Sequence, residues 1–140
     1  MDLERVDEGI LAIDPGREKC GLAVVDGNSV LMKMVINRQE IVSQVKAVLP
    51  SQGPVVIGDR TGSKEFVSEL LLSMPHIHDR VVLIDEHRSS VEARERYWRF
   101  YPPTGWRRLI PVSMQVPPEP IDDLVAVILA ERHIRAGSTK

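Results

Sequence analysis

The first third of the chain carries hydrophobic patterns that predict three strands. An apolar run covers residues 9–13 and ends at Asp14, and a second covers 20–26. Pro15-Gly16 turns the chain between these two runs. Residues 29–36 alternate between apolar and polar positions after the hairpin-type turn Gly27-Asn28. We therefore expect an antiparallel meander of three strands.

Beyond residue 37 the hydrophobic period changes to that of helices. Residues 38–49 have apolar side chains at helical spacing, and short apolar runs at 55–58 and 81–85 predict buried strands. A helix is predicted after each run. Ser63 is expected to cap the first, and a capping box that begins at Ser89 is expected to start the second, which reaches about residue 100. Pro120 stands at the first turn of a last helix, and Glu131, Arg132 and Arg135 are expected to face water.

This order of elements predicts an α/β fold. Each helical crossover makes its flanking strands parallel, so three antiparallel strands followed by two parallel ones form a mixed five-stranded sheet flanked by helices. The ribonuclease H-like fold has this order, and we expect it over a single domain, residues 1–140. Six prolines within 101–120 exclude a helix there, and we expect an arm that packs across the surface.

Composition restricts the function classes. The chain is 43% hydrophobic and 27% charged, with a net charge of -2, which is typical of a globular protein and argues against non-specific attraction to nucleic acid. The longest apolar run, 124–130, is too short for a membrane span, and the acidic first residues do not resemble a signal peptide. We expect a cytoplasmic protein with no membrane partner, whose only cysteine, Cys20, is a buried thiol.

Positive charge and aromatic rings concentrate in residues 88–108. This segment holds six of the thirteen arginines and five of the six aromatic residues. Cations between flat rings suit a phosphate backbone and unstacked bases. The alternative is an amphipathic helix whose rings fill the core, and the two interpretations can hold for different residues.

Acidic residues follow the predicted strands and open the last helix. Asp14, Asp59, Glu86 and Asp122 stand at these positions, and we favour Asp122 over Asp123 because neighbours on a helix point about 100° apart. Converging carboxylates bind Mg²⁺ or Mn²⁺ and support two-metal hydrolysis of a phosphodiester. Asp14, Glu86 and Asp122 are the candidate catalytic and metal-binding residues, with Asp59 as a reserve ligand. The alternative is that these acids only form turns and helix starts.

Several segments resemble the YqgF/RuvX family of ribonuclease H-like nucleases. The resemblance lies in residues 10–16 (ILAIDPG), 20–26 (CGLAVVD), 82–90 (VLIDEHRSS) and 121–126 (IDDLVA). It implies a divalent-metal nuclease linked in bacteria to maturation of pre-16S ribosomal RNA, and also to Holliday junctions. Asp14, Glu86 and Asp122 match the three acidic positions of that family.

One loop departs from the family and resembles another group. Residues 58–63 (GDRTGS) are similar to the YqgF-like domain of the Tex transcription-associated proteins, where this domain is a module of an RNA-binding factor. The loop precedes a helix and could cradle a phosphate. The candidate nucleic-acid-binding residues, in this loop and elsewhere, are Arg17, Lys19, Arg60, Thr61, Ser63, Lys64, Arg88, Trp106, Arg107 and Arg108.

The sequence therefore predicts a metal-dependent endonuclease of structured nucleic acid, with RNA preferred and branched DNA as a further substrate. One alternative is a non-catalytic RNA- or DNA-binding module with the same fold. Another is a Holliday junction resolvase, which would need a homodimer to cut two symmetric strands. The sequence does not set the oligomeric state.

Overall fold

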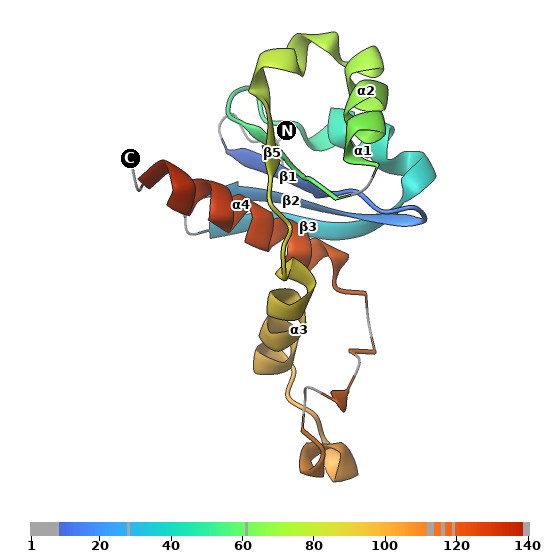
Figure 1. Cartoon of the computed structure of the whole chain (residues 1–140), viewed down its shortest axis with the longest axis vertical. Helices are drawn as coiled ribbons and strands as arrows, with labels where there is room; N and C mark the ends of the chain where they lie inside the picture. Colours follow the sequence, from blue (N-terminus) through green and yellow to red (C-terminus); the bar gives the residue numbers. More distant parts are fainter. Residues whose placement is uncertain are drawn as a thin grey trace, which may run out of the picture.

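The computed structural model describes residues 9–27, 29–60, 62–111, 114–115, 117–118 and 120–138. Five strands form one mixed sheet in the order β3-β2-β1-β4-β5 (Figure 1). Strands β1, β2 and β3 pair antiparallel, whereas β4 pairs parallel with both β1 and β5. The predicted α/β architecture is confirmed. The strands are β1 (Ile10–Asp14), β2 (Lys19–Asp26), β3 (Ser29–Asn37), β4 (Val55–Gly58) and β5 (Val81–Ile84).

Helices cover both faces of the sheet. Helices α1 (Ile41–Val48) and α2 (Ser63–Ser73) lie on one face, and α4 (Asp122–Ser138) crosses the other (Figure 1). Because side chains alternate along a strand, Leu11 and Ile13 of β1 enter the core under α1 and α2, while Ala12 enters the core under α4. Short 3₁₀ segments are η1 (Arg38–Glu40), η2 (Pro75–Arg80) and η3 (Gly105–Leu109).

Helix α3 (Ser89–Phe100) packs on α4 rather than on the sheet. The six successive residues from Val125 to Ala130 are buried, since α4 has the sheet on one side and α3 on another. Of the three residues predicted to face water, Arg135 is exposed, whereas Glu131 and Arg132 are only partly exposed because both pair with α3. Arg96 of α3 donates two hydrogen bonds to Glu131, at 3.0 and 2.8 Å, and Arg132 pairs with Glu92 at 2.8 Å.

The predicted caps of α2 and α3 are also wrong. The N-cap positions are Gly62 and Arg88, both with left-handed backbone (φ 91° and 60°), and neither helix start has a side-chain capping hydrogen bond. Ser63 and Ser89 instead lie one position inside their helices, where both are buried. A serine near a helix start can be the N-cap or the first helical residue, and the sequence alone does not distinguish the two positions.

The proline-rich segment does not pack across the surface. It continues from α3 and projects away from the sheet (Figure 1), and its described residues are mostly exposed. The segment contains the short 3₁₀ helix η3, and its prolines do not supply the apolar contacts that would hold the arm against the core.

Two further expectations concern burial and membranes. Cys20 is fully buried in the core under α1 and α2, as predicted. Among the residues that the structure describes, no helix has the length and apolar character needed to cross a bilayer.

Candidate metal centre and nucleic-acid interface

Three predicted acidic residues come together at one end of the sheet. Asp14 ends the central strand β1, Glu86 follows β5 by two residues, and Asp122 opens α4. Asp14 is 2% exposed, and the side chain of Glu86 is 7% exposed. Arg60 joins them: its Nη2 atom lies 3.1 Å from Asp14 Oδ1, and its Nε atom lies 2.9 Å from Glu86 Oε2.

Two glycines make this convergence possible. Gly21 pairs with Asp14 across β1 and β2, and a Cβ atom at Gly21 would lie 1.8 Å from the carbonyl oxygen of Asp122. The start of α4 therefore rests directly on the backbone of β2, beside Asp14. A Cβ atom at Gly58 would lie 2.3 Å from the carboxyl carbon of Glu86. A side chain at Gly21 would push the backbone of Asp122 away, and one at Gly58 would push the Glu86 carboxylate away.

The loop that carries Glu86 is held by polar contacts on both sides. The Glu86 amide donates to Asp59 Oδ1 at 3.2 Å, and the Arg60 amide donates to Glu86 Oε2 at 3.0 Å. Arg132 of α4 donates to the carbonyl oxygens of Asp85 and His87, at 2.7 and 2.8 Å. Asp59, predicted as a reserve metal ligand, thus has one carboxylate oxygen bound to backbone.

Arg132 is a positioning residue that the sequence analysis missed. The residue pattern gives no signal for it, because an arginine near the end of a helix is usually solvent-exposed.

We expect Arg132→Lys to lower any nuclease activity about 10- to 100-fold, the range typical of residues that orient metal ligands. A lysine cannot bond both carbonyl oxygens and Glu92 with the geometry of a guanidinium. Steady-state cleavage by the variant, with melting temperature to check the fold, would measure the effect; wild-type rates would contradict it.

The electrostatics of the cluster favour a bound cation. Burial raises the pKa of Asp14 to about 9, and hydrogen bonding to and repulsion from Glu86 add to the shift. Burial also raises the pKa of Asp122, against the lowering effect of Arg60. Carboxyl groups whose pKa values are raised by burial in a shared site are typical of functional sites.

The cluster is compatible with a divalent metal. Asp14 Oδ1 and Glu86 Oε1 are buried without a hydrogen-bond partner among the described residues, although Arg60 lies close to the first. Buried carboxylate oxygens of this kind require a partner, and Mg²⁺ and Mn²⁺ prefer such oxygens. As placed, no three histidine, cysteine, aspartate or glutamate residues in the described part of the chain form a ready ligand set. The guanidinium of Arg60 lies against these carboxylates instead.

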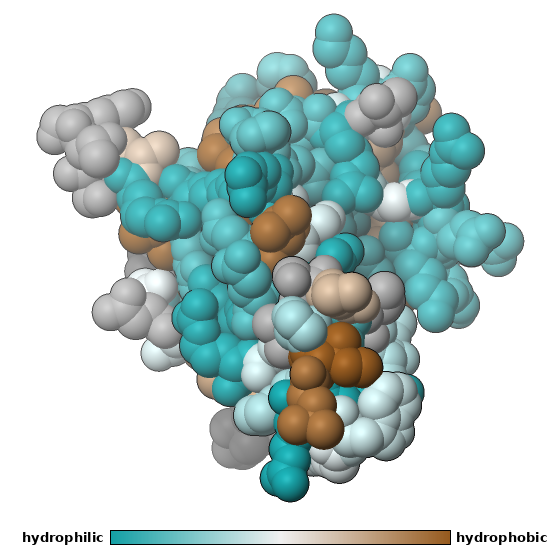
Figure 2. Space-filling model, turned by 60° about the horizontal axis from the view of Figure 1, so that its bottom comes forward, coloured by the Kyte–Doolittle hydropathy of each residue, from teal (hydrophilic) through white to brown (hydrophobic). Residues whose placement is uncertain are grey.

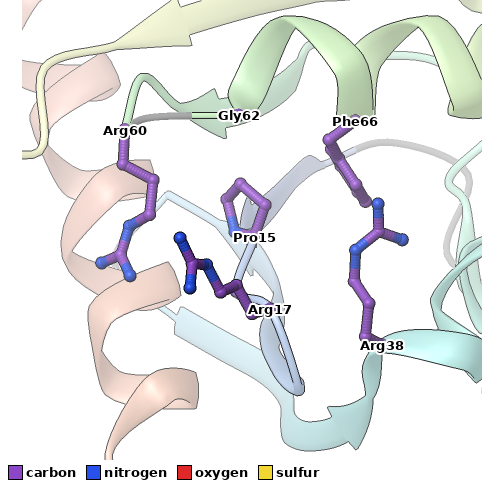
Figure 3. A pocket seen from close by; sticks show the side chains of 7 residues that line it. Pro15, Arg17, Arg38, Arg60, Gly62 and Phe66 are labelled. Carbon is purple, nitrogen blue, oxygen red and sulfur yellow. The ribbon is translucent and has the colours of Figure 1, made fainter.

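A basic pocket opens beside the acidic cluster (Figure 3). Its volume is about 500 Å³, and it is lined by Arg17, Arg38 and Arg60 together with the Pro15-Gly16 turn, Gly62 and Phe66. Arg38 lies over the ring of Phe66 at 4.9 Å and pairs with Glu69 at 2.7 Å. Arg38 was not predicted as a site residue; its signal is its place just after a predicted strand, at the same end of the sheet as Asp14.

The loop 58–63 does not offer a free set of amides to a phosphate. The Asp59 amide donates to Ile84, the Arg60 amide to Glu86 and the Ser63 amide to Arg60. Thr61 lies outside the described residues. These three amides are therefore not available to a phosphate, and the backbone cradle stays a prediction for the rest of the loop. The pocket supplies cationic side chains beside it.

The remaining predicted contacts are scattered around the site. Lys19 begins β2 and lowers the pKa of Asp122 by its charge. Lys64 is exposed on the first turn of α2, whereas Ser63 is buried. Arg88 is exposed and has no ion pair with Glu86.

The aromatic residues of the basic segment divide into two groups. Tyr97 and Trp98 are buried, whereas Phe100, Tyr101 and Trp106 are exposed. The interpretation that aromatic rings fill the core is therefore confirmed for Tyr97 and Trp98. Nucleic-acid contact by the exposed rings stays a prediction. Trp106, Arg107 and Arg108 lie on η3, near the far end of the arm in Figure 1, and Arg107 lies 5.9 Å from the ring of Trp106. Figure 2 shows hydrophobic side chains gathered where this end of the molecule comes forward.

Charge reversal on the arm tests its role in binding. We expect Arg107→Glu with Arg108→Glu to weaken nucleic-acid binding and to reduce the dependence of log Kd on log salt by about 0.7 to 0.9 for each lost phosphate contact. Binding isotherms at several salt concentrations would measure this slope. An unchanged affinity and slope would make the arm structural.

Comparison with known proteins supports the fold. No protein-family model matches the chain, and no curated protein matches it in sequence. Two solved structures of RuvC from Thermus thermophilus are similar in fold, each with a TM-score of 0.53 over 94% of this chain and 96% of the other. One, described as RuvC in complex with a Holliday junction substrate, is 15% identical, and the other is 13% identical. The chain therefore has a ribonuclease H-like fold.

Proposed function

We propose that the protein is a metal-dependent endonuclease of structured nucleic acid, a divergent relative of the YqgF/RuvX nucleases. The observation that carries this proposal is the set of buried carboxylates at the ends of β1 and β5: among the described residues, Glu86 Oε1 has no hydrogen-bond partner, and Asp14 Oδ1 has only the ion pair with Arg60. Their position beside a pocket lined by three arginines fits a negatively charged phosphodiester substrate.

In this proposal Asp14, Glu86 and Asp122 hold divalent cations, Mg²⁺ or Mn²⁺. Two such ions would activate the attacking water and stabilise the leaving oxygen of the phosphodiester. The chain itself contributes burial around Asp14, which keeps bulk water from the ligands, and contacts from Asp59 and Arg132, which fix the loop of Glu86. The pocket arginines would orient the phosphate backbone.

Precursor ribosomal RNA is the first substrate we propose, from the resemblance to the YqgF/RuvX family. A four-way DNA junction is the second, and it is favoured by the similarity of fold to RuvC, one structure of which contains a Holliday junction substrate. The exposed aromatic and basic side chains of the arm suit either substrate.

Two neighbouring aspartates provide a matched test. Asp122 lies within the electrostatic environment of Asp14 and Arg60, whereas Asp123 pairs with Lys33 of β3 at 3.1 Å. We expect Mn²⁺-dependent cleavage of labelled precursor ribosomal RNA or of a four-way junction by the wild type and by Asp123→Asn, and more than a 100-fold loss with Asp122→Asn.

The same assay separates the alternatives. Cleavage of one substrate only would assign the protein to RNA or to branched DNA. Binding of both substrates without cleavage, unchanged by Asp122→Asn, would instead indicate a non-catalytic binding module.

A further inference from the structure

Arg60 belongs to two sites at once. Its guanidinium contacts Asp14 and Glu86 in the acidic cluster, and its side chain also lines the basic pocket. The side chain is 40% exposed, so it is not locked in place by packing. Two sites that share one cation cannot be independent of each other.

Within the acidic cluster, Arg60 occupies the space between Asp14 and Glu86. It approaches Oδ1 of Asp14 and Oε2 of Glu86, which are oxygens that a divalent cation would also contact. A guanidinium and a divalent cation a few ångströms apart repel each other strongly where solvent screening is weak. Metal binding therefore requires Arg60 to move away.

The basic pocket offers Arg60 a second position. The guanidinium groups of Arg17 and Arg60 face the same part of the cavity (Figure 3). Arg17 is exposed and forms no ion pair with any described residue, whereas Arg38 is already paired with Glu69. Two cations that share a cavity need an anion between them, and a tetrahedral phosphate oxyanion accepts hydrogen bonds from more than one guanidinium.

Building on the proposed function, we propose that Arg60 is a shared cation that moves from the acidic cluster to a phosphate bound in the basic pocket. A phosphate group of the nucleic acid, held by Arg17 and Arg60, draws the guanidinium away from Asp14 and Glu86 and frees their oxygens for the metal. Substrate phosphate and divalent metal then bind with positive coupling, and each increases the affinity for the other by the same factor.

Calorimetric titration with Mn²⁺ tests this coupling without an activity assay. Sulfate serves as the probe for the tetrahedral anion, compared with chloride at equal ionic strength. We expect Mn²⁺ to bind the wild type at least about 5-fold more tightly in sulfate, within the usual range of coupling. Pairing of Mn²⁺ with sulfate in solution would weaken the apparent affinity, so it cannot imitate this result.

Three variants assign the effect to residues. Arg60→Gln is expected to bind Mn²⁺ at least about 5-fold more tightly than the wild type in chloride, with no further gain in sulfate. Arg17→Gln is expected to keep the wild-type affinity in chloride and to lose the sulfate effect. Lys46→Gln, on the exposed side of α1, removes the same charge away from the site and is expected to behave as the wild type.

Each outcome has a definite meaning. If the wild type binds Mn²⁺ with equal affinity in both salts, or if Arg60→Gln keeps the sulfate effect, the shared-cation proposal is overturned while the metal site stands. If Mn²⁺ binds Arg60→Gln but not the wild type in chloride, Arg60 is confirmed as the competitor. If no variant binds Mn²⁺, the proposed nuclease function fails and this proposal fails with it.

Discussion

Asp14→Asn is expected to abolish metal-dependent cleavage and, at the same time, to make the metal-free protein more stable. The loss of activity should exceed about 100-fold, because changes that only orient metal ligands already cost 10- to 100-fold. The gain in stability comes from the same burial that suits the residue to bind a cation. A neutral amide does not suffer the penalty of a buried carboxylate, and its NH₂ group can donate to Glu86.

The pH dependence follows from the pKa of Asp14, which the fold raises from 3.8 to about 9. A raised pKa means that the folded protein binds the proton more tightly than the unfolded chain does. The stability contributed by this protonated carboxyl is fully present below pH 3.8 and is lost as the pH rises towards 9. The advantage of Asp14→Asn should therefore grow across this window and exceed about 1.4 kcal/mol at pH 8, the equivalent of one pKa unit.

Denaturant unfolding at pH 5 and pH 8 in EDTA would measure this advantage for both proteins. Asp26→Asn, which removes an exposed carboxylate at the end of β2, is the control and should show no such change. Added Mn²⁺ should reverse the order by stabilising only the wild type. Equal stability of wild type and Asp14→Asn at pH 8 would show that Asp14 carries no buried charge penalty.

The order of elements and the sheet could be predicted because both follow from hydrophobic period. Alternating residues in the first third and buried runs at 55–58 and 81–85 leave few topologies, and β4 was predicted with the bounds that the structure gives. The ends of helices were harder to predict. The sequence signal at Ser63 and Ser89 is that of a cap, but the left-handed backbone of Gly62 and Arg88 moves each cap one residue earlier.

The acidic cluster could be predicted in outline because strand ends meet at one edge of a sheet. What the sequence could not show is the network that holds it. Arg132, which lies 46 residues after Glu86 in the chain, reaches the loop of Glu86 from α4. Arg38 enters the basic pocket from just beyond the end of β3. Such contacts depend on how α4 crosses the sheet and on where β3 ends, and neither is encoded in a local pattern.

Gly21→Ala is expected to damage the metal centre by displacing the start of α4. The added Cβ atom would lie 1.8 Å from the carbonyl oxygen and 2.3 Å from the carbonyl carbon of Asp122. Backbone on both sides of the contact cannot turn away as a side chain can, so the helix start must move. Overpacking of this kind costs about 1–3 kcal/mol, which corresponds to a fall of roughly 3–10 °C in melting temperature for a chain of this size.

The displacement should cost function as well as stability, because Asp122 moves with the helix. Calorimetry should show Mn²⁺ affinity reduced at least about 10-fold, since effects of that size follow when a metal ligand loses its orientation. Gly27→Asn is the matched control. Gly27 directly follows the other end of β2, its φ of 60° suits asparagine, and a Cβ atom there would meet nothing within 4 Å. If Gly21→Ala melts and binds Mn²⁺ as the wild type does, the close approach of β2 and α4 does not position Asp122. If only the melting temperature falls, the glycine serves packing alone, and the metal ligands lie elsewhere than at the start of α4.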